Sequence, residues 1–148
     1  MRTISAQEIT DTVARLCIEA NLRLPDDVVS AIECAEIEEP WDGAKRILSL
    51  LGDNVRIAEE KTLPMCQDTG MACVFLELGQ NVHIDGDLEE AVNNGVRRGY
   101  GEGYLRKSVV CDPLRRINTG DNTPALLSVK VVPGESLRIT VMPQGFGS

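Results

Sequence analysis

The sequence lacks several features that would place it in a familiar structural class. Aromatic residues make up only 3% of its 148 residues, there is a single histidine, and no apolar run approaches the roughly 18 residues of a membrane span. Its five cysteines show neither CxxC nor zinc-ribbon spacing, so disulfides and structural zinc are disfavoured. The first ten residues lack the charged and apolar regions of a signal or transit peptide, so we expect a cytoplasmic protein.

Positive charge is also scarce. The net charge is −8, and basic residues cluster only in adjacent pairs, so neither nucleic acid nor a membrane is an expected partner. An apolar content of 43% in 148 residues suffices for one hydrophobic core and is too small for two independent ones. We therefore expect a soluble single domain over residues 1–148.

The first 60 residues have the periodicity of helices. Ser5 and Glu8 form a capping-box pattern before a helix predicted over 6–20. Two more helices are predicted over 26–37 and from about 41 to 58. Cys17 and Cys34 fall on the apolar faces of the first two helices, so we expect both to be small buried side chains.

Residues 61–148 mix short strands with one further helix. A β-prone apolar run predicts a buried strand over 71–78, and Asp87 is placed to cap a helix that begins at Leu88. Residues 127–131 and 137–141 alternate with period two around a Pro-Gly turn, which predicts an antiparallel hairpin. The fold class is therefore α+β, with N-terminal helices followed by a mixed or antiparallel sheet and one further helix.

The chemistry-bearing residues are concentrated in the loop 63–70. Cys66, Gln67 and Asp68 place a soft thiolate, an amide and a carboxylate side by side, between Pro64 and Gly70. Such groups can build a metal or substrate site, and loops commonly carry function. An ordinary turn, in which Asp68 bonds the local backbone and Cys66 is incidental, explains the same spacing. The motif alone leaves both interpretations open.

Four segments, in this order, resemble the class I, iron–sulfur-dependent fumarate hydratases and the alpha subunits of L-tartrate dehydratase. The segments are Pro64 with the Cys-Gln-Asp-Thr-Gly run 66–70, Gly-Tyr-Leu-Arg-Lys-Ser at 103–108, Asn-Thr-Gly-Asp-Asn-Thr-Pro at 118–124, and Pro-Gln-Gly-Phe-Gly-Ser at 143–148. They span residues 64–148. The helical first third is compatible with the family but does not identify it.

The resemblance implies a [4Fe–4S] cluster bound by three cysteines, of which Cys66 would be one. It also implies that Asp68 holds the departing hydroxyl and that Gln67 contacts a substrate carboxylate. Arg106 is the matching candidate for a bidentate carboxylate clamp. Gly147, which lacks a side chain, would let a backbone N–H approach the substrate.

The activity implied is the reversible hydration of fumarate to L-malate, a step of tricarboxylic acid metabolism, with L-tartrate dehydration as the alternative. The expected partners are a beta subunit or C-terminal domain, a small dicarboxylate and further copies of the chain. The resemblance implies that the other two cluster cysteines lie downstream of this sequence, since Cys73 and Cys111 match no family ligand position, and that the beta component supplies the proton-abstracting group. We therefore expect the isolated chain to be inactive, to carry no cluster and to self-associate through residues 66–70 or the predicted hairpin.

Two other classes of function are weaker alternatives. His83 could pair with Cys66 in a cysteine-nucleophile hydrolase, with Asp68 or Asp85 as the orienting group. In a non-catalytic binding module, Cys66 would be neither a nucleophile nor a metal ligand. Iron content and visible absorption of the anaerobically prepared protein separate the first interpretation from both alternatives.

Overall fold

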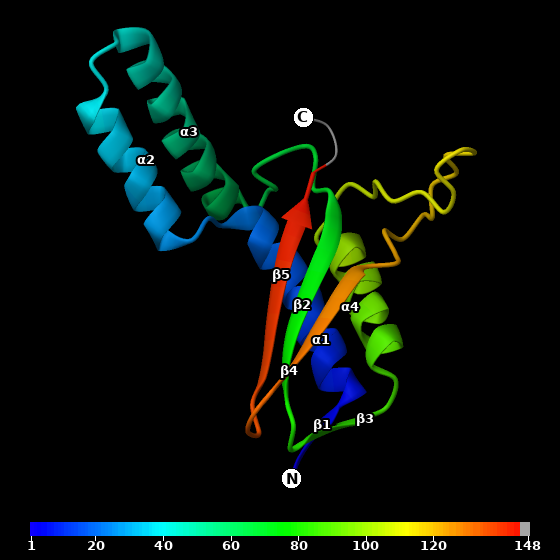
Figure 1. The fold of residues 1–148 in the computed structure, drawn as a ribbon. Coiled ribbons are helices and arrows are strands. Elements are labelled where there is room, and N and C mark those ends of the chain that lie inside the picture. Colours follow the sequence, from blue (N-terminus) through cyan, green and yellow to red (C-terminus); the bar gives the residue numbers. More distant parts are fainter. Residues whose placement is uncertain (146–148) are drawn as a thin grey trace. The chain divides into compact units, whose positions relative to one another are not determined.

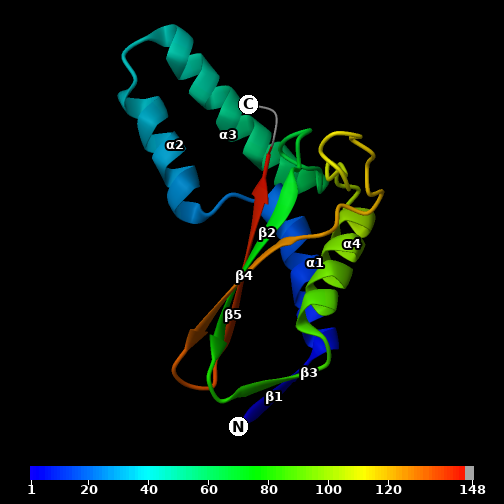
Figure 2. The same ribbon diagram turned by 45° about the vertical axis from the view of Figure 1, so that its right-hand side comes forward.

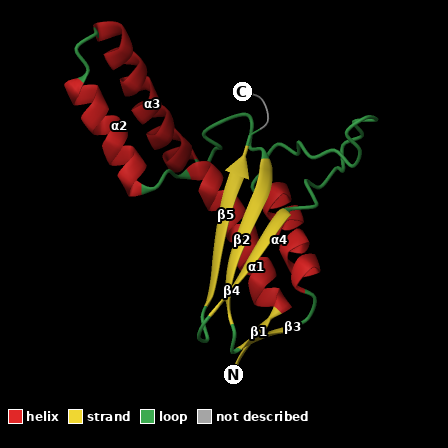
Figure 3. Cartoon of the chain, viewed as in Figure 1, coloured by secondary structure: helices red, strands yellow, loops and turns green. Residues whose placement is uncertain are grey.

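The computed structural model describes residues 1–145, and its order of elements confirms the α+β class (Figures 1 and 3). The elements are β1 (Arg2–Ser5), α1 (Ala6–Leu22), α2 (Asp26–Glu38), α3 (Asp42–Lys61), β2 (Met71–Gly79), β3 (Val82–Asp85), α4 (Leu88–Glu102), β4 (Leu126–Val132) and β5 (Leu137–Gln144). The short strands β1 and β3, which the sequence did not predict, pair in parallel as a separate two-stranded sheet.

The chain divides into two compact units. The first, the sheet unit, comprises Met1–Ala20 with Gln67–Ser148, and the second, the helical unit, comprises Asn21–Cys66. The expectation of a single domain stays a prediction. Among the described residues, no helix combines the length and the apolar character needed to cross a membrane.

The main sheet of the sheet unit has the strand order β4-β2-β5. β2 pairs in parallel with β4, with Cys73 opposite Leu126, and antiparallel with β5, with Met71 opposite Gln144. The predicted antiparallel hairpin is therefore wrong, because β2 lies between the two strands that were expected to pair. The chain that follows β2 is instead bonded to the turn that joins β4 to β5. There the Asn81 N–H donates to the Gly134 carbonyl over 2.9 Å.

Helices α1 and α4 lie side by side on one face of this sheet (Figures 1 and 2). Their apolar faces and the inward side chains of β2 form the core, which includes Ile9, Val13, Cys17, Val74, Leu76, Val92, Val96 and Tyr100. Gly95 and Gly99 bring α4 against α1, since a Cβ at Gly95 would lie 2.6 Å from the Val13 Cβ. The prediction that Cys17 is buried is confirmed, and burial raises the pKa of its thiol to about 12.

Local capping sets the start of both helices, as the sequence predicted. The Glu8 N–H donates to the Ser5 hydroxyl over 3.2 Å, and the Ser5 N–H donates to the Glu8 carboxylate over 3.0 Å. At the start of α4, the Asp87 carboxylate accepts from the Glu90 N–H over 2.9 Å.

The helical unit consists of α2 and α3, which run antiparallel and pack against each other (Figure 1). α3 continues without interruption through Gly52. No residue of α2 is buried, so the prediction that Cys34 is buried is wrong. A helical period predicts which side chains share a face but not whether another element covers that face. Large apolar side chains of this unit are exposed as well, namely Ile37, Trp41, Ile47, Leu50 and Leu51.

Candidate functional site

The loop that carries Cys66 begins where α3 ends. Thr62 adopts a left-handed conformation (φ 54°) that terminates the helix. The Met65 N–H donates to the Asn21 carbonyl over 2.9 Å, and the Asn54 side chain donates to the Met65 carbonyl over 2.9 Å. These bonds fix the backbone before Cys66, whose side chain is exposed at the end of the helical unit.

In the sheet unit, Asp68 lies just before β2. Its carboxylate is half-buried and accepts from the Gly70 N–H over 3.1 Å, which is a local Asx turn. Gly145 passes close to this carboxylate, because a Cβ at Gly145 would lie 3.1 Å from Asp68 Oδ2. The side chain of Asp68 is thus bonded to the backbone at Gly70 and lies close to the backbone at Gly145.

Asp68 and Arg106 line one pocket of about 620 Å³ in the sheet unit. The other residues that line it are Met71, Lys107, Ser108, Val109, Val110, Arg116 and Asn118. Three cationic side chains and one carboxylate therefore surround a space large enough for a small acid. This excess of positive charge suits an anion with two carboxylates. Two of the cations, Lys107 and Arg116, were not singled out from the sequence.

Two hydrogen bonds join the Asp68 loop to the Arg106 segment and to helix α4. The Thr69 hydroxyl donates to the Arg106 carbonyl over 2.9 Å, and the Tyr100 hydroxyl donates to the Thr69 carbonyl over 2.8 Å. Tyr100 is 1% exposed, and desolvation raises the pKa of its phenol, so the hydroxyl stays protonated as a donor. Arg106 is thus positioned through its backbone, while its guanidinium remains exposed.

The other predicted site residues lie apart from this pocket or outside the described part of the chain. Gln67 is exposed and does not line the pocket. Gly147, predicted to approach the substrate through its backbone, lies outside the described residues 1–145, so its predicted role stays a prediction. Cys66 belongs to the helical unit. Of the predicted set, the structure therefore brings together Asp68 and Arg106.

His83 lies far from Asp68. It is exposed on β3, which follows the end of β2, whereas Asp68 precedes the start of that strand. Nine residues of extended strand span about 30 Å. A catalytic group that combined His83 with Asp68 is incompatible with this separation.

Cysteine is the residue through which this chain could hold an iron–sulfur cluster. Cys66 offers an exposed thiol on a loop, which fits a cluster ligand. Cys73 is 5% exposed within β2, and residues 1–145 contain no group of three His, Cys, Asp or Glu side chains placed to hold one metal ion. Within residues 1–145 the donor set therefore fits a single thiolate ligand at Cys66.

A protein-family model described as fumarate hydratase (Fumerase) matches residues 10–148 of the chain. A Methanocaldococcus jannaschii protein, named provisionally as the alpha subunit of L(+)-tartrate dehydratase, is 35% identical over 95% of the chain and 52% of its own length. The anaerobic class I fumarate hydratase of Escherichia coli is 37% identical over 64% of the chain and 18% of its own length. The Escherichia coli L(+)-tartrate dehydratase alpha subunit is 28% identical over 97% of the chain and 48% of its own length.

The length of these matches differs between the two kinds of relative. The chain spans about half the length of the tartrate dehydratase alpha subunits and about a fifth of the fumarate hydratase. In each case the similarity includes only part of the curated protein.

Proposed function

We propose that this chain, which belongs to the fumarate hydratase (Fumerase) family, forms part of a hydro-lyase. The enzyme adds water to fumarate to give L-malate. The observation that carries the proposal is the pocket in which Asp68 and Arg106 lie together with Lys107 and Arg116. A dianionic four-carbon acid needs at least two fixed cations and one group that can hold a hydroxyl. This pocket offers both.

In this proposal Arg106 clamps one carboxylate of the substrate, since a guanidinium can bind a carboxylate through two parallel hydrogen bonds. Lys107 and Arg116 raise the local concentration of the dianion through their charge. The Asp68 carboxylate accepts a hydrogen bond from the substrate hydroxyl and so orients it. Its own bond from the Gly70 N–H, 3.1 Å long, fixes the direction of that acceptor.

A bound [4Fe–4S] cluster supplies Lewis-acid chemistry for the departure or addition of the hydroxyl. Cys66 would be one of its ligands. Gln67, exposed beside Asp68 in the sequence, is proposed to contact a substrate carboxylate once the rest of the site is assembled. Gly147 is proposed to contact the substrate through its backbone N–H. A beta subunit or a C-terminal domain is proposed to supply the group that takes the proton from carbon.

A second candidate is L-tartrate dehydration, with the chain as part of an alpha subunit. Coverage favours it, since the match to the Escherichia coli alpha subunit includes 97% of the chain, against 64% for the anaerobic fumarate hydratase. Both substrates share the four-carbon dicarboxylate frame, which is the feature that Arg106 and Lys107 can recognise. The second hydroxyl of tartrate distinguishes the two.

The test is turnover by the complete protein, prepared without oxygen, on L-malate and on L-tartrate in parallel. Iron and sulfide are measured on the same samples. A kcat/KM for L-malate at least tenfold above that for L-tartrate supports the first candidate, and the reverse ratio supports the second. Full iron and sulfide content with no turnover of either acid would refute the hydro-lyase proposal.

A further inference from the structure

The side chain of Asn122 is fully buried where three loops of the sheet unit meet. Its Oδ1 atom accepts from the N–H of Ser108 over 2.7 Å and from the N–H of Val109 over 3.1 Å. Its Nδ2 atom donates to the Gly70 carbonyl over 3.0 Å. One amide group therefore bonds two segments that are 38 positions apart in the sequence at their nearest bonded residues, Gly70 and Ser108.

Those two segments carry the two predicted site residues that share the pocket. Asp68 lies two residues before Gly70, and Arg106 lies two residues before Ser108. Neither segment belongs to a helix or a strand, so no regular hydrogen-bond ladder fixes its backbone. The distance between the carboxylate and the guanidinium therefore depends on side-chain bonds to the backbone, of which Asn122 makes three.

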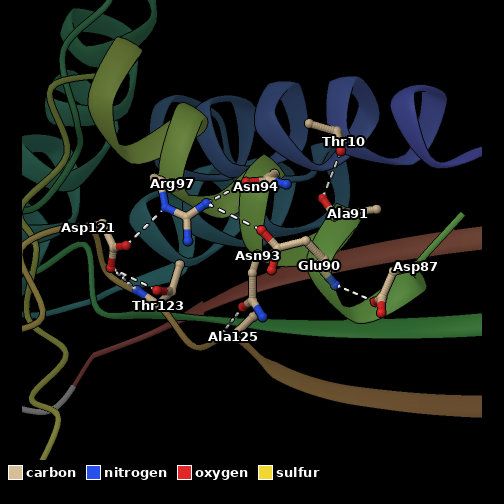
Figure 4. A network of polar contacts seen from close by, with 10 residues as sticks. All are labelled: Thr10, Asp87, Glu90, Ala91, Asn93, Asn94, Arg97, Asp121, Thr123 and Ala125. Carbon is tan, nitrogen blue, oxygen red and sulfur yellow. Dashed lines mark hydrogen bonds and ion pairs between the residues drawn. The ribbon is translucent and has the colours of Figure 1, made fainter.

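Asp121 and Ala125, which precede and follow Asn122 in the sequence, are bonded to helix α4 (Figure 4). Before Asn122, the Asp121 carboxylate accepts from Arg97 Nε over 3.0 Å and from the Thr123 N–H over 3.0 Å. After it, the Asn93 side chain accepts from the Ala125 N–H over 2.9 Å. The loop is thus bonded to one face of the helix.

The geometry also explains why the residue is asparagine. Its backbone is left-handed (φ 65°), a conformation that asparagine tolerates better than most side chains. Its amide is both an acceptor and a donor, whereas a carboxylate or an aliphatic group of similar size lacks one or both functions. A buried polar group with every bond satisfied is rigid, and a partly satisfied one is costly.

We propose that Asn122 is a positioning residue, which sets the spacing between Asp68 and Arg106 and thereby the fit of the dicarboxylate. It acts through the backbone of Gly70 on one side and of Ser108 and Val109 on the other. The inference rests on the proposed function only for the identity of the ligand. The link between the two segments is a property of the chain itself.

The first test is amide hydrogen exchange on the 148-residue chain. Asn122→Ala removes all three bonds to the backbone, whereas Asn122→Asp keeps the acceptor for Ser108 and Val109 and places a carboxylate against the Gly70 carbonyl. We expect the alanine variant to lose exchange protection of the Ser108 and Val109 backbone amides by about tenfold or more. We expect the aspartate variant to retain this protection. Retained protection in Asn122→Ala would overturn the proposal.

The second test is steady-state kinetics of the complete protein with the better of its two dicarboxylate substrates. We expect Asn122→Ala to raise KM and lower kcat, with kcat/KM reduced by about 100-fold, because the segments of Asp68 and Arg106 both lose their bonds to Asn122. Asn122→Asp should leave KM within about threefold and lower kcat by about tenfold, since the Arg106 segment keeps its bonds while the Gly70 side is disturbed. If Asn122→Ala does not fold, the kinetics of Asn122→Asp test the proposal instead. A lowered kcat with a nearly unchanged KM supports positioning, and an unchanged kcat refutes it.

Thr10→Val is the matched control. It removes a part-buried hydrogen bond of the same unit, from the Thr10 hydroxyl to the Ala91 carbonyl over 2.9 Å, without touching either loop (Figure 4). Its kinetics and its Ser108 and Val109 exchange should match the wild type. An equal loss of kcat/KM in Thr10→Val and in the Asn122 variants would show that the Asn122 variants act through a general loss of stability. That result would refute the positioning role. A wild-type protein inactive on both acids refutes the proposed function, and the exchange measurement still decides the role of Asn122.

Discussion

Replacing Gly70 with alanine would damage the sheet and the pocket together. Gly70 is left-handed (φ +60°) at the point where the Asp68 loop enters β2. A Cβ there would overlap the Gln144 carbonyl oxygen and lie 2.7 Å from the Gly145 nitrogen. These are backbone atoms at the end of β5, so no side-chain rotation relieves the contact. The first residue pair between the two strands, Met71 with Gln144, must move apart.

The expected cost can be built from its parts. A left-handed conformation costs an alanine about 1–2 kcal/mol. Separating the end of the strand pair costs one or two hydrogen bonds, about 1–3 kcal/mol in total. The smaller entropy of the unfolded alanine chain returns about 0.4–1 kcal/mol. We expect the free energy of unfolding to fall by about 1–5 kcal/mol.

Urea titration of the 148-residue chain, followed by circular dichroism, measures this loss, and two other glycines provide matched controls. Gly120 is left-handed (φ +82°) with nothing within 4 Å of a Cβ, so Gly120→Ala isolates the backbone strain. Gly101 lies in α4 with the same open space, so Gly101→Ala should stabilise by about 0.5–1 kcal/mol. A Gly70→Ala chain no less stable than Gly120→Ala would refute the steric argument.

Three further predictions concern the site and its support. Cys66→Ser in the complete protein should abolish iron retention and activity together, because a hydroxyl replaces a thiolate poorly; retained iron with full activity would contradict a ligand role. Arg106→Ala should raise KM for the dicarboxylate about 10–100-fold with unchanged iron content, and an unchanged KM would show that its guanidinium does not contact substrate. Desolvation raises the pKa of Asp121, but bonds from the Thr123 amide, Arg97 and the Thr123 hydroxyl outweigh it and lower the pKa to about 2. Asp121 should therefore contribute stability, on the order of 1 kcal/mol, that is present above pH 4 and lost as the pH falls toward 2; urea titrations at pH 5 and pH 2.5 should show a smaller pH effect in Asp121→Asn.

Local sequence signals predicted the helices well because they act within a few residues. Ser5 with Glu8, and Asp87 before Leu88, place their hydrogen bonds where the patterns indicated. The pairing of β4 with β5 was predicted wrongly for a physical reason. A period-two pattern with a turn shows that two strands exist and turn back, but it cannot show that the equally apolar β2 inserts between them.

Which side chains are buried, and which residues share the site, depends on long-range contacts and was harder to predict from the sequence. Cys17 and Cys34 look alike in the sequence, yet α1 packs into the hydrophobic core whereas no residue of α2 is buried, so one thiol is buried and the other exposed. Asp68 and Arg106 were predicted through the family resemblance, and the structure brings them to one pocket. Asn122 was missed as a support, although its position in a polar loop between glycine and proline could have indicated a constrained backbone.

The central position of β2 has a consequence for how the chain is made. Neither of its partners, β4 and β5, has been synthesised when β2 leaves the ribosome, because both follow α4 in the sequence. At a translation rate of roughly 5–20 residues per second, several seconds pass between the synthesis of β2 and that of β5. Both edges of β2 lack their partner strands for much of this time. During that time its apolar run is a potential site of wrong pairing and a candidate for chaperone binding. Translation speed between α4 and β5 should therefore influence the yield of folded protein.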